Sequence, residues 1–500
     1  MQRLAKITLF LSLPVSILGC TDAGDNETNA DDTGAETTDP TGATDPTGDP
    51  TTNPTDASAT MTTTMTTMST DPDTTDTDPS DTDATDTTPE GCADGDDANA
   101  PRMPLDTEIT EDTLLTCDTV WVLTGETYVR GAVLSLEPGT TVVGQNGSAL
   151  VIDTDASINA AGTADAPIIF TSAQPVGERA RQDWGGVVLL GLAEVNLPNG
   201  VGLAEGFADP PSYGGTDPAH NCGTLQYVRV EWAGFELVVD NELNAFTFYA
   251  CGTGTTVDHI QAHMGSDDSF EAFGGGFDAK YLVSSGGADD AFDLDLGFNG
   301  TFQYAFVHQD PSEADSNHGL EWSNGPDSFT ATPLTSPWIA NMTFVGQGDG
   351  GNAGKSIGFN IKQGAEAHIF NSYFTNVTGS GATFQDEATI AVAEGNGIVV
   401  EGTFWGTAGA FGHQGDGPYS WDDTMWGDFL TGQDGNQTDV DLGLDGTWTT
   451  PNIKPAADSA AVGGGVDPGN PALESTTYVG AVDPEAADDW TQAGWINYAI

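Results

Sequence analysis

From residue 119 onward, hydrophobic residues come in short runs that Gly, Pro, Asp or Asn residues separate. Examples are the runs at residues 119–123, 132–136, 149–152 and 168–172, which are rich in Val, Ile and Leu. Such runs, with β-branched residues and turn-forming breaks, predict β-strands joined by turns. No stretch shows the 3.6-residue period of an amphipathic helix, so the pattern predicts an all-β body without helices.

One pattern returns after 22 residues. The sequence DDSFE at residues 267–271 is followed by DDAFD at residues 289–293, and Ile260 and Leu282 share the interval. A fixed period of this size marks a repeat architecture in which each repeat is one structural unit. Because the units read as strands, the period predicts a right-handed parallel β-helix, with equivalent residues about 4.8 Å apart on successive coils. A β-sandwich is the alternative, but the recurring register favours the solenoid.

Two columns of inward-facing side chains follow from this register. The first is expected to contain the pairs Val228/Val230, Ile260/Ala262, Leu282/Ser284, Tyr304/Phe306, Met342/Phe344 and Ser372/Phe374. The second is expected to contain Phe246, Phe270, Phe292 and Leu320. One solenoid can be long, so residues 92–500 are predicted to form a single body. Its ends need caps, and an N-terminal cystine loop and the Trp-containing C-terminal tail are the expected ones.

Several segments together resemble a family of large secreted or surface-anchored bacterial β-helix proteins. The segments are LEPGT at 136–140, DAPIIFTS at 165–172, RARQDWGG at 179–186, YGG at 213–215, LQYVR at 225–229, the acidic stretch 266–275, and residues 478–495. The resemblance covers about residues 118–500 and implies a β-helix fold and an exported location. It implies little about activity, because members of this family are mostly uncharacterised. The chain departs from the family in its first 91 residues.

The N-terminus has the features of a bacterial lipoprotein signal. Arg3 and Lys6 precede a short apolar stretch, which ends in Gly19 and Cys20. The stretch is too short for a comfortable transmembrane helix. Residues 1–19 are therefore predicted to be a signal peptide and Cys20 the lipidated residue, which anchors the protein in a membrane. Thr21, where an aspartate would favour the inner membrane, indicates the outer membrane and the cell surface. An ordinary signal peptide with an incidental cysteine is the alternative.

Residues 20–91 have a different composition from the rest. They are built mainly from Thr, Asp, Pro, Ala, Gly and Ser, and contain no Lys, Arg or aromatic residue. Such a segment cannot bury enough apolar surface to offset the entropy lost on ordering. It is predicted to be a disordered acidic linker that tethers the folded body to the membrane.

The formal net charge of the chain is −65. This charge excludes nucleic acid as a partner, because a polyanion would be repelled. An anionic polysaccharide could bind only if divalent cations bridged the two. Adaptation to salty surroundings is the alternative explanation of the acidic surface.

Four cysteines remain after Cys20, an even number that suits an oxidising compartment. The expected disulfides are Cys92–Cys117 and Cys222–Cys251, although four cysteines allow three connectivities. No CxxC spacing is present, which disfavours zinc.

The acidic repeat is the candidate metal site. Stacked carboxylates repel one another unless a cation, a proton or bulk water relieves them. Calcium takes six to eight oxygen ligands, so two coils at strand spacing can supply several of them. The predicted calcium ligands are Asp267, Asp268, Glu271, Asp289, Asp290, Asp293 and Asp295, with Glu321 as an extension. The alternative is that these residues cap turns or form a solvated acidic face.

Catalytic candidates are fewer. Lys280 lies between the two acidic segments in sequence, where a lyase would need a base, but Asp258 precedes it by the same 22 residues. A stacked ion pair between them is the preferred explanation. His259 and His263 on one strand would lie about 13 Å apart, too far for one zinc ion.

Arg179 and Arg181 are rare bases in this chain and are expected to pair with Asp183 or neighbouring acids. Taken together, the sequence favours a non-enzymatic interaction or adhesion module at the cell surface, with calcium-dependent glycan binding. A polysaccharide lyase or glycoside hydrolase and a passive structural surface protein are the alternatives.

Overall fold

The computed structural model describes residues 90–500, except for residues 236–242, 327, 349–354, 407–409 and 416. The predicted signal peptide, the lipidation site Cys20 and nearly all of the predicted tether lie outside the described residues.

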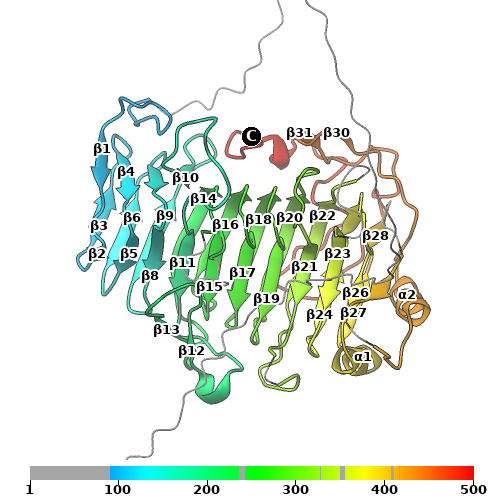
Figure 1. Ribbon diagram of the computed structural model, residues 1–500. Coiled ribbons are helices and arrows are strands. Elements are labelled where there is room, and N and C mark those ends of the chain that lie inside the picture. Colours follow the sequence, from blue (N-terminus) through cyan, green and yellow to red (C-terminus); the bar gives the residue numbers. More distant parts are fainter. Residues whose placement is uncertain (1–89, 236–242, 327, 349–354, 407–409, 416) are drawn as a thin grey trace, which may run out of the picture. The chain divides into compact units, whose positions relative to one another are not determined.

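The described body winds as a parallel β-helix, which confirms the predicted fold class (Figure 1). Successive coils add parallel strands to two long sheets. Sheet A contains β1 (Arg102–Pro104), β4 (Val120–Leu123), β7 (Thr141–Gly144), β10 (Ile168–Ser172), β14 (Gly223–Glu231), β16 (Thr256–His263), β18 (Asp278–Ser285), β20 (Thr301–His308), β22 (Trp338–Val345), β24 (Ala367–Phe370) and β27 (Ile398–Glu401). Sheet B contains β2 (Glu108–Ile109), β5 (Glu126–Val129), β8 (Ala149–Ile152), β11 (Val187–Leu190), β15 (Phe246–Tyr249), β17 (Phe270–Phe273), β19 (Phe292–Asp295), β21 (His318–Trp322), β23 (Ile357–Ile361), β26 (Thr383–Phe384) and β29 (Gly412–His413).

Five further strands join sheet A beside this path: β3 (Thr113–Leu115), β6 (Val133–Leu136), β9 (Ser157–Ala161), β25 (Tyr373–Thr375) and β28 (Phe404–Trp405). The long strand β14 pairs with both β9 and β10, so from β14 to β22 one strand spans what are two strands in the coils before and after. Two short antiparallel hairpins lie outside the sheets: β12 (Gly202–Leu203) with β13 (Ser212–Tyr213), and β30 (Asp445–Thr447) with β31 (Thr450–Asn452).

The inward column of sheet A confirms most of the predicted register. Ile260 pairs with Val228 on one side and Leu282 on the other, and all three are buried. The expectation for the next coil is wrong, because Leu282 pairs with Ala305, 23 positions later, and not with Tyr304. A shift of one residue turns every side chain of a strand to the opposite face.

Consequently Ala305 and Val307 face the core, whereas Phe306 packs on the outer side of the sheet. In the following coils the predicted inward residues are correct again. Met342 pairs with the inward-facing Ala305, and Phe374 pairs with Phe344.

The inward column of sheet B is a stack of aromatic rings, as predicted. The ring centroid of Phe270 lies 5.4 Å from that of Phe246 and 5.0 Å from that of Phe292, with the rings nearly parallel. Leu320 continues the column in β21, because Asp293 and Glu321 are paired one position further along. These side chains belong to the main hydrophobic core.

A second aromatic stack follows a bend in the strands of sheet A. Tyr227, His259, Tyr281 and Tyr304 have φ angles between 50° and 62°, a left-handed conformation that is uncommon for residues other than glycine. Their rings stack along the solenoid with centroid distances of 4.3, 4.2 and 5.0 Å. Ring contacts of this kind contribute about 0.5–1.5 kcal/mol each beyond burial, which offsets part of the backbone strain.

The last residues of the chain run back along the outer face of sheet A, and we call residues 463–500 the C-terminal strap (Figure 1). Three amide side chains of the solenoid each make two hydrogen bonds with one backbone residue of the strap, one through oxygen and one through nitrogen. The pairs are Gln261 with Asn497, Gln303 with Glu474, and Asn371 with Val466. The strap also brings Trp490 and Trp495 edge-on against the stacked rings of Tyr281 and Tyr227.

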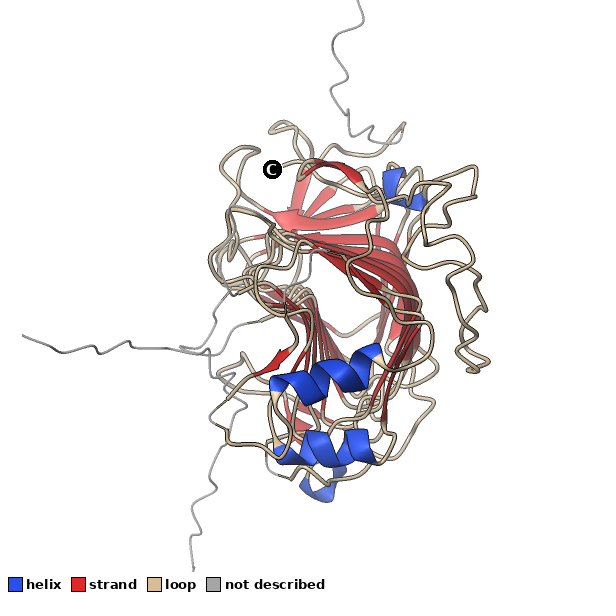
Figure 2. Cartoon of the chain, turned by 90° about the vertical axis from the view of Figure 1, so that its right-hand side faces the viewer, coloured by secondary structure: helices blue, strands red, loops and turns tan. Residues whose placement is uncertain are grey.

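Two short α-helices, which the sequence pattern did not predict, lie after the last long strands: α1 (Glu387–Glu394) and α2 (Asp423–Thr431). Asp386 and Asp422 cap their N-termini through side-chain hydrogen bonds. Trp426 and Leu430 of α2 belong to the main core, and Figure 2 looks onto this end of the solenoid. These helices therefore cap the C-terminal end, whereas the Trp-containing tail, expected to be the cap, covers sheet A.

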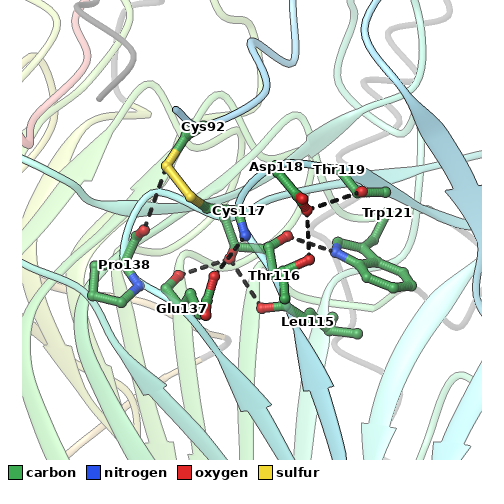
Figure 3. The surroundings of a disulfide bond; sticks show 10 residues. Cys92, Leu115, Thr116, Cys117, Asp118, Thr119, Trp121, Glu137 and Pro138 are labelled. Carbon is green, nitrogen blue, oxygen red and sulfur yellow. Dashed lines mark hydrogen bonds between the residues drawn. A yellow bond between two sulfur atoms is a disulfide. The ribbon is translucent and has the colours of Figure 1, made fainter. Parts of the chain in front are cut away.

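Both predicted disulfides are present, Cys92–Cys117 and Cys222–Cys251. Around the first one, Cys117 donates its backbone N–H to Glu137, at 3.1 Å (Figure 3). The indole of Trp121 donates to the carbonyl oxygen of Thr116 at 3.0 Å. This cystine therefore fixes the segment before β1 to the first coils, as expected for an N-terminal cap.

Candidate metal centre

The acidic repeat lies on sheet B, in the neighbouring strands β17 and β19. Side chains alternate between the two faces of a strand. Phe270 and Phe292 face the core, so Glu271 and Asp293, which are paired in register, face outward. Glu321 in β21 pairs with Asp293 and extends the column, as predicted. The sequence interval therefore stacks three acids on three successive coils.

The aspartates that precede these strands cap the turns. The backbone N–H of Asp290 donates to Oδ1 of Asp268 at 2.9 Å, and that of Asp268 donates to Oδ1 of Asn244 at 3.1 Å. In the same way, the N–H of His318 donates to Oδ1 of Asp290 at 2.6 Å. The turn-cap alternative is thus present for Asp268 and Asp290. A carboxylate can accept about four hydrogen bonds or metal contacts, so capping does not use up its capacity.

The same residues converge in two groups that suit a cation. One oxygen each of Asp268, Glu271 and Asp293 lie within 4.8 Å of one another, and all three residues are buried. A second group, made of Asp267, Asp268 and Asp289, has the same spacing and is more open to solvent. Two oxygens bound to one calcium ion at about 2.3–2.6 Å are at most about 5 Å apart, so both groups fit this ion.

A third group contains a residue that the sequence reasoning missed. Asp290, His318 and Glu321 have ligand atoms within 4.8 Å of one another, and all are buried. His318 stands two residues before Leu320, as Asp290 stands two residues before Phe292, so the register offered the signal. The imidazole Nδ1 lies 2.9 Å from Oδ1 of Asp290 and 3.4 Å from Oε1 of Glu321.

The surroundings of Asp268 are strongly acidic. Burial raises the pKa of Asp268 well above its usual value, and the charges of Asp267, Asp290, Glu271 and Asp293 raise it further. A buried carboxylate among carboxylates is stable only if it gains a proton or a cation. This environment therefore favours uptake of positive charge.

The neighbouring coil has its own compensation. Burial opposes ionisation of Glu321, but Lys362, with which it forms an ion pair, and His318 lower the pKa of Glu321 to about 2. Burial also opposes protonation of His318, but Asp290 and Glu321 raise its pKa above the usual value. Glu321 is thus paired within the protein and is less available for a metal ion than Glu271.

Asp295, the last of the predicted ligands, is set apart from the three groups. Its carboxylate accepts a hydrogen bond from the backbone N–H of Leu296. Burial raises the pKa of Asp295 to about 6. The structure therefore brings six of the seven predicted ligands together and gives Asp295 a local backbone contact.

We call the acids of these three groups the acidic ladder: Asp267, Asp268, Glu271, Asp289, Asp290, Asp293 and Glu321. Lys280 is not near this ladder. It lies in β18 of sheet A, whereas the ladder lies on sheet B. Its register partner is Asp258, as predicted, but its ammonium group bonds to Glu474 of the C-terminal strap at 2.5 Å. The expected ion pair with Asp258 is wrong, because the strap supplies a closer acid. Asp258 bonds instead to His259.

The two arginines pair with acids, as expected, although not with Asp183. Arg179 bonds to Asp96, and Arg181 bonds to Asp310 at 3.1 Å and Glu313 at 3.2 Å. His263 contacts the backbone oxygen of Ala499, in the strap, at 2.8 Å. His259 lies in the aromatic stack and, like His263, faces the strap, where its ring lies edge-on to that of Trp495.

A family model described as a pectate-lyase-like β-helix domain matches residues 107–439, a span that contains all the acidic groups described above. No curated protein and no solved structure matches the chain. In the part of the chain that the structure describes, neither helix has the length and apolar character needed to cross a bilayer.

Proposed function

Because this chain belongs to the family of pectate-lyase-like β-helix domains, we propose that it is a non-catalytic interaction module of the cell surface. In this proposal a lipid on Cys20 and the acidic tether present the β-helix outside the outer membrane. A calcium ion between the coils of β17 and β19 holds the solenoid in its binding-competent form, and the ligand is a glycan.

The observation that supports the cation is the group of Asp268, Glu271 and Asp293. These residues are 4%, 8% and 7% exposed. Carboxylates this buried are too enclosed to meet a polymer directly, so the ion would be held by the protein alone and would act as a structural link. When bound, calcium would supply positive charge beside the buried carboxylate of Asp268, whose raised pKa reflects the cost of its negative charge there.

The same burial argues against a catalytic role for this group. A lyase needs a base beside the bound uronate, but Lys280 lies on the other sheet and Lys362 is paired with Glu321. Arg179 and Arg181, the two arginines that the sequence singled out, are held in ion pairs. An interaction function requires none of these groups to be available.

The test is thermal unfolding of the exported protein in EDTA and in excess calcium, at one high ionic strength. Binding to the folded state alone contributes about 2.7 kcal/mol at a hundred times Kd, which for a body of this size is a rise in Tm of about 3 °C. Glu271→Gln and Asp293→Asn should each abolish most of this rise. The control is Glu178→Gln, which removes an exposed acid far from the ladder in sequence and should leave the rise intact. An equal Tm in both solutions contradicts the calcium site.

A polysaccharide lyase or hydrolase is the second candidate, and one observation favours it. The charge of Glu321 acts on Asp295, yet burial raises the pKa of Asp295 to about 6, while Lys362 and His318 lower that of Glu321 to about 2. Two carboxyl groups with pKa values pushed apart are the pattern of an acid and base pair. Release of unsaturated or reducing ends from uronate or neutral polysaccharides, lost in Glu321→Gln, would replace the first proposal with this one.

A further inference from the structure

A cavity of about 590 Å³ lies between the last coils of sheet A and the segment that follows α2. Its volume falls within the range of about 300–1,000 Å³ that is usual for small-molecule sites. The residues that matter for recognition are Tyr373, Asn376, Trp405, Phe411, Asp439 and Asp441. This cavity is separate from the acidic ladder, which lies on sheet B.

The wall of the cavity is held by backbone hydrogen bonds. Trp405 in β28 donates its N–H to the carbonyl oxygen of Gln437 at 2.9 Å, and Val440 donates to the carbonyl oxygen of Trp405 at 3.0 Å. The phenol of Tyr373 donates to the carbonyl oxygen of Val440 at 2.9 Å. The segment 437–440 therefore runs beside β28 as a fixed wall, so the cavity is formed before any ligand arrives.

Two aromatic rings make a corner in this wall. The rings of Trp405 and Phe411 have centroids 5.1 Å apart and planes at 86°. The indole N–H of Trp405 is buried and has no hydrogen-bond partner in the structure. Because the side chain of Trp405 is 1% exposed and belongs to the main core, it backs this wall from the inside, and the half-buried Phe411 is the ring that a ligand can reach.

The polar part of the lining is acidic. Asp439 and Asp441 are exposed, and no Lys, Arg or His is among the residues that line the cavity. An anionic ligand, such as a uronate or a phosphate ester, would be repelled. A purely cationic ligand would suit the two aspartates but would leave the apolar part of the lining, Phe411, Val440 and Leu444, without a partner.

From these contacts we propose that the cavity is a binding site for a neutral sugar residue. Sugar hydroxyls both donate, to the carboxylates of Asp439 and Asp441, and accept, from the side-chain amide of Asn376. The apolar face of the sugar ring packs on Phe411. This inference rests on the proposed interaction function, since it names the ligand class and its site, but it does not depend on calcium.

The experiment is saturation-transfer NMR on the exported protein in EDTA, below its unfolding temperature. The probes are neutral tetrasaccharides of glucose, galactose and mannose, each measured separately, with tetragalacturonate as the anionic probe and tetramethylammonium as the cationic probe. We expect transfer to the ring protons of at least one neutral tetrasaccharide, and none to the two charged probes.

Two variants locate the binding. Thr438→Trp places a large ring in the exposed lining of the cavity, and Phe411→Ala removes one of its aromatic walls; each should reduce transfer at least tenfold. Thr110→Trp, an exposed position near the N-terminal end, is the matched control and should keep the full signal. The proposal is overturned if no neutral probe shows transfer, if a charged probe gives the stronger signal, or if Thr438→Trp leaves the signal unchanged. Because calcium is absent, failure here is independent of the Tm test above.

Discussion

The carboxylate of Asp268 accepts a hydrogen bond of 2.9 Å from the backbone N–H of Asp290, the residue that occupies its own position one coil later. The acid of one repeat thus caps the turn of the next, while its charge adds to a cluster of acids. The acceptor and the charge can be separated by mutation, because asparagine keeps the oxygen and loses the charge.

Asp268→Asn is therefore expected to stabilise the protein in EDTA, by about 1–2 kcal/mol. The variant keeps the cap but avoids the cost of burying a charge, or of binding a proton, among four neighbouring acids. Urea unfolding measures the difference. Asp268→Ala, which removes both the cap and the charge, is the comparison and should be less stable than Asp268→Asn. A less stable Asp268→Asn in EDTA would show that the carboxylate charge is already compensated without metal.

The pH dependence of stability should contain a contribution from His308. Burial lowers the pKa of His308 to about 4, and the charge of Asp310, itself bonded to Arg181, only partly opposes this. The folded pKa is below the unfolded value of about 6.5, so the stabilising contribution is complete above pH 6.5. It is lost as the pH falls from about 6.5 to 4, because only the unfolded chain binds the proton there.

At pH 5 this loss is on the order of 2 kcal/mol. The measurement is urea unfolding of the protein and of His308→Gln in EDTA at several values between pH 7.5 and 4. The free energy of unfolding should fall more steeply with decreasing pH in the unmodified protein. Parallel curves for the two proteins would contradict a neutral buried imidazole at this position.

Trp495 should be a main anchor of the C-terminal strap. Its ring is 1% exposed and lies edge-on to the stacked rings of Tyr227 and His259. Trp495→Ala is expected to reduce the free energy of unfolding by about 3–5 kcal/mol, as for other buried aromatic residues. Trp495→Phe, which keeps a ring in place, should lose less. If both variants lose under 1 kcal/mol, the strap does not contribute to the stability of the solenoid.

The ring stack in the core offers a test of packing away from any polar group. Phe292 is fully buried between Phe270 and the following coil. Phe292→Leu should cost about 1 kcal/mol and Phe292→Ala about 3–5 kcal/mol, because the second change leaves a cavity in a column that cannot collapse along the axis. Denaturant unfolding with unchanged m values would confirm that the fold is retained. A similar loss for both variants would argue against tight stacking.

The sequence predicted which residues pair on neighbouring coils wherever the length of the repeat was constant. An interval of 22 residues gives the correct partners from Ile260 to Leu282 and from Phe270 to Phe292. It fails at Tyr304, because a coil of 23 residues moves the inward positions of β20 by one, and the hydrophobic pattern alone does not show this change. The two short helices were missed because eight or nine residues carry little helical periodicity.

The candidate site was predictable for the same reason and to the same extent. Six acids that share the repeat come together, whereas His318 falls after an irregular loop and was missed. The partner of Lys280 could not be predicted either, since Glu474 is 194 residues away and no repeat relates the two. Contacts made by the strap depend on where the chain turns back, which no local pattern encodes.

The strap also decides how the molecule would respond to force. A solenoid can be peeled coil by coil, because each coil contacts only its neighbours. Here the chain returns from the last coils and is fastened at Asn371, Gln303 and Gln261, which ties β16 to β25 into one mechanical unit. A pull on the N-terminal side would load the coils before β14, where the cystine of Cys92 and the ion pairs of Arg130 reinforce the first turns. The N-terminal coils of the protein would then extend under tension, whereas the coils that the strap fastens would resist extension.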